Sequence, residues 1–385
     1  MLASHRGRLA SRVPSLDSTV APRDAKHSYA ILRGLTAPGG GMVAATTLGL
    51  PERARAGRNY DYRYVWLRDQ AYAGIAAGVD EPYPLLDDAV SFLTARLLEH
   101  GSTVAPAYRV DGSDVPAEAT LGLSGYPGGR DVVGNWVNGQ FQLDAIGETL
   151  QVLAVAAGDD RLNADNHRAL RIAVDTVKQR WNQPEAGIWE LDDDWWSHSR
   201  LACVAGLRSV AAYAPQNATA ELESLADEIL AETSRRCLSP RGHWQRSPSH
   251  TGTDAALLLP PVRGALTASD ARTIGTLRAV EQDLTSDGYL YRFAHEDIPL
   301  GEAEGAFLLC GFGMSLAQWH QGDEVAAFRW FERNRAACGT AGILTEEFDV
   351  RQRQLRGNLP QAFVHAMLLE CSQRLTSPYQ QGIGR

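Results

Sequence analysis

The chain has 385 residues, of which 44% are hydrophobic, and its formal net charge is −9. A chain of this length can bury a core that needs neither disulfides nor a structural metal, and its negative charge argues against a nucleic-acid surface. No stretch approaches the roughly 20 consecutive apolar residues of a membrane-spanning helix, so we expect no membrane contact.

The N-terminal segment is basic but has no apolar core, which is not typical of a secretory signal. We therefore expect a cytoplasmic protein, with residues 1–26 as a loose arm and residues 27–385 as a single domain. The five cysteines lack metal-ligand spacing and the ten histidines are dispersed. This pattern favours reduced thiols, no metal site and no cofactor.

From residue 27 onward, apolar residues recur mostly at helical spacing, and the alternation typical of strands is scarce. The pattern predicts an all-α fold of about twelve helices, with the boundary errors usual for such predictions. The predicted helices begin near His27, Asp69, Pro84, Asn138, Asn163, Ser197, Thr219, Thr253, Ser269, Glu304, Glu324 and Gln361.

The predicted helices alternate in character along the chain. Every second one is nearly all small or apolar, as in FQLDAIGETLQVLAVAAG, whereas most of the others are amphipathic and charged, as in ELESLADEILAETSRR. A helix that is apolar on all sides is buried, and an amphipathic helix covers a surface. The alternation predicts an inner ring wrapped by an outer ring, in six helical hairpins. A stacked solenoid is the alternative, although no repeat of fixed period supports it.

The links from each outer helix to the next inner helix are mostly long and rich in Trp, Tyr, Arg, Asp and Glu. In an up-and-down ring these links all emerge at one end, and long loops on a rigid scaffold commonly carry function. We expect them around one mouth, at about residues 38–68, 101–137, 182–196, 238–252, 286–303 and 339–360.

Aromatic faces beside charged groups suit a sugar, because a pyranose ring stacks on Trp or Tyr while its hydroxyls need convergent donors and acceptors. The segment RNYDYRYVWLRDQ places Arg68, a planar donor fork, next to Asp69, an acceptor. That pair would hold two neighbouring hydroxyls. The alternative is an ion-paired anchor for the loop.

Hydrolysis of a glycoside usually takes two carboxyl groups, of which one must stay protonated. Glu190, in GIWELDDDWW, follows Trp189 and precedes three aspartates. Apolar burial and neighbouring negative charge raise the pKa of a carboxyl, so Glu190 is a plausible acid. For the second carboxyl, GILTEEFD offers Glu346, Glu347 and Asp349, and the residues alone leave the choice open.

Eight segments resemble, in chain order, the motifs of glycoside hydrolase family 15, the glucoamylase family. They extend from about residue 29 to residue 371 and comprise VAATTLGLPERARAGRNYDYRYVWLRDQ, LSGYPGGRDVVGNWVNGQFQLDAIGE, AGIWE, TDAALLLPP, DGYLYRF, EGAFLLCGF, GILTEEFD and GNLPQAFVHAMLL. The resemblance implies an α/α toroid of six hairpins. It also implies hydrolysis of α-glucosidic bonds from the non-reducing end with inversion of the anomeric carbon.

The resemblance assigns the two carboxyls. It makes Glu190 the general acid and Glu346, the first acidic residue of its motif, the general base. Glu347 then supports the base, and Tyr60 lies beside the catalytic water.

The resemblance also implies a pocket for one glucose. Arg68 and Asp69 would hold the 4- and 6-hydroxyls of the terminal sugar, and Arg292 would bind the same sugar. Trp66 and Trp189 are further candidates for the pocket wall. A second sugar site would use loop residues such as Trp136, Trp195 and Trp196.

Two departures from the family pattern bear on the substrate. Many bacterial relatives carry a β-sandwich domain before the toroid, for which we expect no room here. Relatives also often have Tyr where this chain has Phe293. Neither departure removes a catalytic carboxyl.

The leading hypothesis is an exo-acting α-glucosidase for small α-1,4 or α-1,6 gluco-oligosaccharides of the maltose or isomaltose type. A trehalase is the alternative within the same class. A catalytically silent sugar-binding or regulatory toroid is the alternative from another class. A silent module would usually have lost one carboxyl, so the presence of both Glu190 and Glu346 favours an enzyme.

Overall fold

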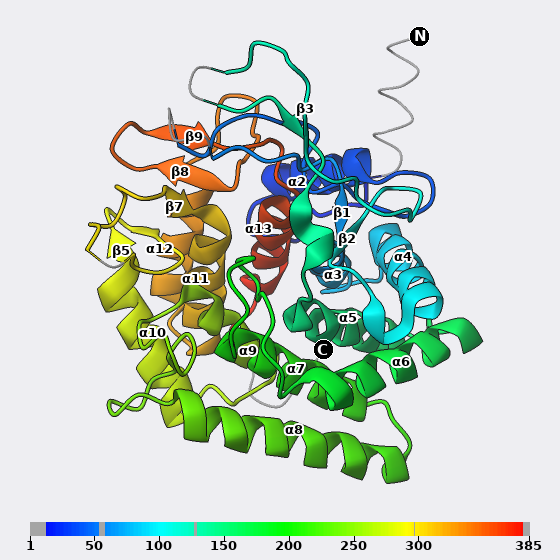
Figure 1. The fold of residues 1–385 in the computed structure, drawn as a ribbon. Helices are drawn as coiled ribbons and strands as arrows, with labels where there is room; N and C mark the ends of the chain where they lie inside the picture. Colours follow the sequence, from blue (N-terminus) through cyan, green and yellow to red (C-terminus); the bar gives the residue numbers. More distant parts are fainter. Residues whose placement is uncertain (1–12, 54–57, 127–128, 296, 380–385) are drawn as a thin grey trace.

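The computed structural model describes residues 13–53, 58–126, 129–295 and 297–379, and Figure 1 shows the chain as a ribbon. Of the twelve α-helices in these residues, six form an inner ring in which each helix contacts the next and the last contacts the first. The inner helices are α3 (Leu67–Ala77), α5 (Leu143–Gly158), α7 (Ser197–Ala211), α9 (Leu259–Val262), α11 (Leu308–His320) and α13 (Ala362–Arg374). The closed ring confirms the predicted α/α toroid.

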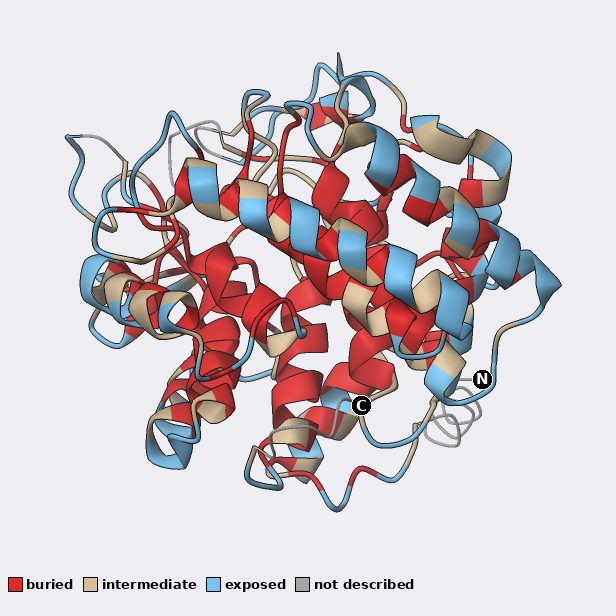
Figure 2. Cartoon of the chain, turned by 90° about the horizontal axis from the view of Figure 1, so that it is seen from below, coloured by how far each residue is buried: buried red, intermediate tan, exposed pale blue. Residues whose placement is uncertain are grey.

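The other six helices cover the ring. They are α2 (Pro22–Leu35), α4 (Pro84–His100), α6 (Ala164–Arg180), α8 (Gln216–Cys237), α10 (Ala271–Leu284) and α12 (Glu324–Arg335). Every residue of α3 is buried, whereas α8 buries only one residue on about every turn. Figure 2 shows this division, with exposed residues along the outward side of the covering helices. None of the helices in the described residues is long and apolar enough to cross a membrane.

Several predicted helix starts are accurate, and a side-chain cap marks the start of α6. Helices α4, α7 and α12 begin at the expected residues, and Asn163 caps α6 by accepting from the backbone N–H groups of Asp165 and Asn166. The helix expected from residue 138 begins at Leu143 instead. The preceding residues form a short 3-10 helix, η2 (Trp136–Gly139), in which the Val137 N–H donates to the Asn135 side chain.

The eighth predicted helix is much shorter than expected. It consists of one 3-10 turn, η3 (Ala255–Leu258), followed by the four residues of α9. Pro260 and Pro261 lack the N–H groups that would continue a helical ladder. Gly264, at a φ of +95°, then ends it.

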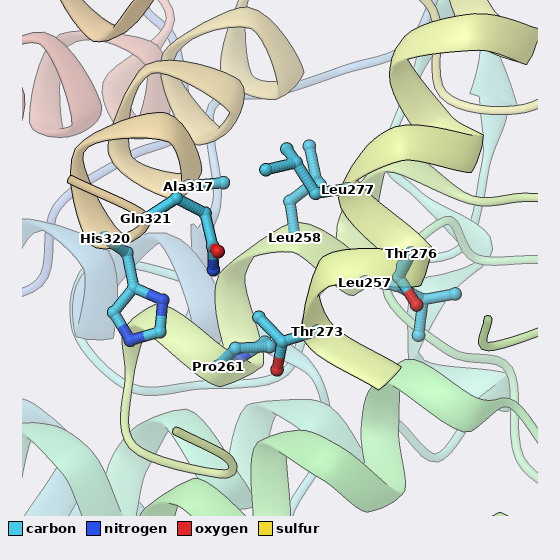
Figure 3. A pocket seen from close by; sticks show the side chains of 9 residues that line it. All are labelled: Leu257, Leu258, Pro261, Thr273, Thr276, Leu277, Ala317, His320 and Gln321. Carbon is cyan, nitrogen blue, oxygen red and sulfur yellow. The ribbon is translucent and has the colours of Figure 1, made fainter. Parts of the chain in front are cut away.

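A small internal cavity lies where this shortened helix meets α10 and α11 (Figure 3). Its volume of about 10 Å³ can hold about one water molecule, so it is too small for a sugar. Its walls are formed by Leu257, Leu258, Pro261, Thr273, Thr276, Leu277, Ala317, His320 and Gln321.

The expected loose arm is wrong over residues 13–26. Leu16 is only 1% exposed, the N–H of Val20 donates to the carbonyl of Ser372 in α13, and α2 already begins at Pro22. Burial of an apolar side chain and pairing of the backbone hold this segment against the ring. Residues 1–12 of the predicted arm lie outside the described residues.

Short strands tie neighbouring loops together at the mouth of the ring. Strand β1 pairs with β2, β3 with β4, β5 with β6, and β7, β8 and β9 form a three-stranded sheet. Their bounds are Val65–Trp66, Ala107–Tyr108, Ala119–Thr120, Val132–Val133, Thr285–Ser286, Tyr289–Leu290, Ala306–Phe307, Glu347–Asp349 and Gln354–Arg356, and one further 3-10 turn is η1 (Gly101–Thr103). The pair β1–β2 joins two different predicted loops, so these two long loops meet as expected. Strand β7 instead lies within the helix predicted to begin near Glu304, and it pairs with β8 of the last predicted loop.

Candidate active site

Glu190 lies in a tight turn that presents its carboxyl to the segment before α3. Its N–H donates to the carbonyl of Gly187 at 3.2 Å, and its φ of +55° is rare for a residue other than glycine. Such backbone strain is often found at functional sites. The Glu190 Oε1 accepts a hydrogen bond from Trp66 Nε1 at 2.7 Å and lies 3.5 Å from Arg68 Nη2. The carboxyl therefore faces two predicted pocket residues.

Glu346 lies immediately before β8, and its side chain is nearly buried. The Tyr62 hydroxyl donates to Glu346 Oε2 at 3.0 Å. The ring of Tyr62 meets that of Trp66 edge to face at 5.7 Å, and Trp66 in turn donates to Glu190. One aromatic pair thus contacts both predicted catalytic carboxyls, Tyr62 with its hydroxyl and Trp66 with its indole.

The tyrosine that contacts the proposed base is Tyr62, whereas the prediction placed Tyr60 beside the catalytic water. The ring of Tyr60 instead stacks on that of Tyr62, with centroids 6.2 Å apart and planes 10° apart. In an extended chain, residues two apart share a face. Tyr60, Tyr62, Tyr64 and Trp66 all share that parity, so alternation alone could not choose among them.

Arg68 and Asp69 open α3 and are almost fully buried, with 5% and 4% exposure. Arg68 Nη1 donates to Gln142 Oε1 at 2.8 Å and to Asp144 Oδ2 at 3.0 Å, both at the start of α5. Asp69 Oδ1 has no hydrogen-bond partner within the described part of the chain. Burial raises the pKa of Asp69 to about 7. A buried acceptor without a partner is unusual, and a ligand hydroxyl would satisfy it.

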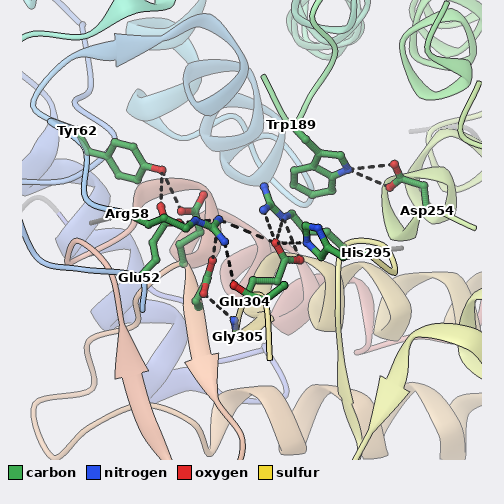
Figure 4. Close-up of polar contacts among 12 residues, drawn as sticks. Glu52, Arg58, Tyr62, Trp189, Asp254, His295, Glu304 and Gly305 are labelled. Atoms are coloured by element: carbon green, nitrogen blue, oxygen red, sulfur yellow. Dashed lines mark hydrogen bonds and ion pairs between the residues drawn. The ribbon is translucent and has the colours of Figure 1, made fainter. Parts of the chain in front are cut away.

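Trp189 and Arg292 are two further predicted pocket residues, and Figure 4 shows Trp189 beside Asp254. Trp189 Nε1 donates to both carboxyl oxygens of Asp254, at 3.0 and 3.1 Å. Arg292 pairs with Glu304, and its guanidinium carbon is 4.2 Å from the centre of the Phe307 ring and 5.4 Å from that of Trp189. The side chains of Arg292 and Trp189 are thus both fixed by charged partners.

The three tryptophans expected at a second sugar site differ in exposure. Trp136 is 47% exposed and can present a face to a ligand. Trp195 and Trp196 are 4% and 6% exposed, and their rings lie under the guanidinium groups of Arg200 and Arg246. Trp136 is therefore the most exposed ring of the three, and the part of Trp195 and Trp196 in a second sugar site stays a prediction.

Glu347 points away from Glu346 and is fully buried. Its Oε2 accepts from the Gly305 N–H at 2.7 Å, and its Oε1 lies 3.7 Å from Arg58 Nη2. Adjacent residues at a strand face opposite sides, which explains the divergence. Glu347 therefore belongs to a charged cluster that sequence reasoning missed and that includes Glu52, Arg58 and Glu304 (Figure 4).

The charges of this region are strongly coupled. Burial raises the pKa of Glu346, and the neighbouring Glu52 carboxyl raises it further, against the opposing effect of Arg292. Burial raises the pKa of Glu347 in the same way. Glu304 differs, because Arg292 and His295 outweigh the effect of burial and lower its pKa to about 2. These carboxyls thus differ in proton affinity, and the raised pKa falls on Glu346, the residue predicted to act as the base.

The helical toroid gathers carboxyls, arginines and indoles from several loops at one end, an arrangement that suits the hydrolysis of a glycoside. The comparison with known families agrees, since residues 28–373 match the model of glycosyl hydrolases family 15. The chain belongs to glycoside hydrolase family 15.

Similar curated proteins are trehalases. The chain is 30% identical to trehalase 1 of Sulfolobus acidocaldarius over 89% of this chain and 62% of that protein. It is 31% identical to the trehalase of Mycobacterium tuberculosis over 89% of this chain and 53% of that protein. The chain thus spans little more than half the length of these relatives.

Similar solved structures share the fold. A bacterial glucoamylase complexed with acarbose superposes with a TM-score of 0.72 at 16% identity, over 96% of this chain and 58% of that one. A glycosidase variant in complex with glucose also gives a TM-score of 0.72, at 21% identity, over 92% of this chain and 96% of that one.

Proposed function

We propose that the chain hydrolyses the α-glucosidic bond at the non-reducing end of a small gluco-oligosaccharide, with inversion. The observation that carries this proposal is the placement of Glu190 and Glu346 at the two ends of the Trp66–Tyr62 pair. Glu190, next to the donors Trp66 and Arg68, acts as the general acid and protonates the leaving oxygen. Glu346, held by the Tyr62 hydroxyl, accepts a proton from the attacking water.

The neighbouring polar groups suit a single terminal glucose. The free acceptor of Asp69 and the guanidinium of Arg68 would bind adjacent hydroxyls, and Arg292 would add a third charged donor. Hydrogen bonds to charged groups are stronger than neutral ones, so such a pocket selects a sugar by its hydroxyl pattern. Glu347 supports the base indirectly, because its hydrogen bond to Gly305 fixes the strand that follows Glu346.

The stereochemistry of the product tests this mechanism. With water between the base and the anomeric carbon, the two carboxyls should be about 6.5–9.5 Å apart, and the first sugar released should be β-glucose. Proton NMR during early turnover distinguishes the anomers before they equilibrate. Initial release of α-glucose from the non-reducing end of a longer maltodextrin would exclude inversion and, with it, the assignment of Glu346 as a base for water.

Trehalose is a second candidate substrate. The curated relatives from Sulfolobus acidocaldarius, Thermoplasma acidophilum and Mycobacterium tuberculosis are all trehalases, at 29–31% identity over 89–90% of this chain. Because trehalose also ends in an α-linked glucose, the same terminal pocket would serve it. Initial rates of glucose release from trehalose, maltose, isomaltose and longer maltodextrins separate the two candidates. Release from none of the four would favour a silent sugar-binding module.

A further inference from the structure

The Tyr62 hydroxyl lies between two carboxyls rather than one. It is 3.0 Å from Glu346 Oε2 and 3.4 Å from Glu52 Oε1, and Glu52 is only 5% exposed. A tyrosine hydroxyl has one proton to donate. It therefore binds one of these carboxylates at a time, and the two carboxyls compete for it (Figure 4).

We propose that Glu52 is a positioning residue for the catalytic base, and that through the shared Tyr62 hydroxyl and its own charge it sets the pH at which Glu346 ionises. The inference rests on the proposed function only in giving Glu346 the role of base. It assigns to Glu52 no contact with the substrate.

Burial raises the pKa of Glu52 as well, but Arg58 opposes this rise, so the geometry favours Glu52 as the carboxyl that ionises first. Arg58 Nη2 lies 2.9 Å from Glu52 Oε2, and Glu346 has no ion pair of this kind among the described residues. Once Glu52 is ionised, its charge disfavours a second negative charge across the same hydroxyl. Glu52 thus raises the proton affinity of Glu346, and Tyr62 lowers it when it donates to Glu346.

The other charged groups around the pair are fixed by contacts of their own. Arg292 pairs with Glu304, and Arg58 Nη2 also lies 3.7 Å from Glu347 and 4.0 Å from Glu304. From α3, Asp69 raises the pKa of Glu346, and Arg292 lowers it. Burial raises the pKa of Tyr62 well above its ordinary value, and the charges of Glu346, Glu52 and Glu190 raise it further, so its hydroxyl stays protonated and can donate. Among these groups, Glu52 is the one that shares a hydrogen-bond donor with Glu346.

Glu52→Gln tests the inference, because glutamine keeps the size of the side chain and removes its charge. Without that charge Glu346 ionises more readily, so the acidic limb of the kcat/KM profile should move to lower pH by about one unit. Glu52→Asp retains the charge and should leave the limb near its wild-type position. Glu302→Gln, an equal charge change at an exposed residue nearby, should also leave it in place.

An acidic limb that does not move in Glu52→Gln would overturn the inference, since a merely structural role of Glu52 lowers activity without moving the limb. An equal shift in Glu302→Gln would overturn it as well. Carbon-13 NMR of glutamate-labelled wild-type protein gives a second readout that needs neither turnover nor a variant at position 52. The Glu346 carboxyl, assigned with Glu346→Gln, should titrate in two coupled steps. A single independent step would contradict the coupling even if no sugar is cleaved, so the two proposals can fail separately.

Discussion

We expect Glu346→Gln to reduce kcat by about 10²–10⁴-fold, the usual contribution of a general base. Glutamine fills the same space, and its amide oxygen can still accept the hydrogen bond that Tyr62 donates to Glu346. The change therefore removes proton acceptance while leaving the local packing in place. The rate is measured on whichever of trehalose, maltose, isomaltose and longer maltodextrins is cleaved fastest. A thermal melt of the same variant shows whether a lower rate reflects lost catalysis or lost folding.

Glu347→Gln is the matched control one residue away. An amide at position 347 can still accept from the Gly305 N–H, so we expect activity within about tenfold of wild type, with the main effect on the ion pair to Arg58. An inactive Glu347→Gln beside an active Glu346→Gln would mean that the base is Glu347. Azide added to Glu346→Ala offers a positive test, since it can replace the activated water and give β-glucosyl azide from an activated α-glucoside.

The helical ring could be predicted because the apolar periodicity that indicates each helix is local in sequence and extends over many residues. Helices such as α5 and α8 repeat their apolar pattern over several turns, which fixes both their type and their side of the ring. The strands are two or three residues long, too short for alternation to be visible. The short length of α9 was not predicted, because the apolar run TDAALLLPP is typical of a buried helix. Its two prolines are the local feature that indicates an interrupted helix.

The residues of the site also fall into those that local motifs predict and those that they do not. Arg68, Asp69 and Glu190 stand in compact motifs, and the structure brings them together. The partners that hold them are distant in the chain, such as Asp144 for Arg68, and no local pattern links such pairs. The sequence indicates Glu52 only weakly, as an acidic residue in the same motif as Tyr62. The fold shows that the carboxyls of Glu52 and Glu346 both contact the Tyr62 hydroxyl.

Arg68→Ala is expected to have two large effects with different physical causes. The guanidinium forms an ion pair with the fully buried Asp144, and breaking a buried ion pair from one side typically costs about 3–5 kcal/mol of folding free energy. If Arg68 also binds the terminal glucose, the loss of charged hydrogen bonds should lower kcat/KM by about 10- to 150-fold. Chemical unfolding and steady-state kinetics measure the two effects on the same protein.

The double variant Arg68→Ala/Asp144→Asn separates these effects. Asparagine removes the buried charge that Arg68→Ala leaves without a partner, so we expect much of the lost stability to return. Activity should remain low, because no side chain in the double variant replaces the donor fork that faces Glu190. Recovery of kcat/KM together with stability would instead show that Arg68 is an ion-paired anchor for the start of α3. The sugar would then be held mainly by Asp69 and Arg292, and Asp69→Asn would become the variant with the larger loss of kcat/KM.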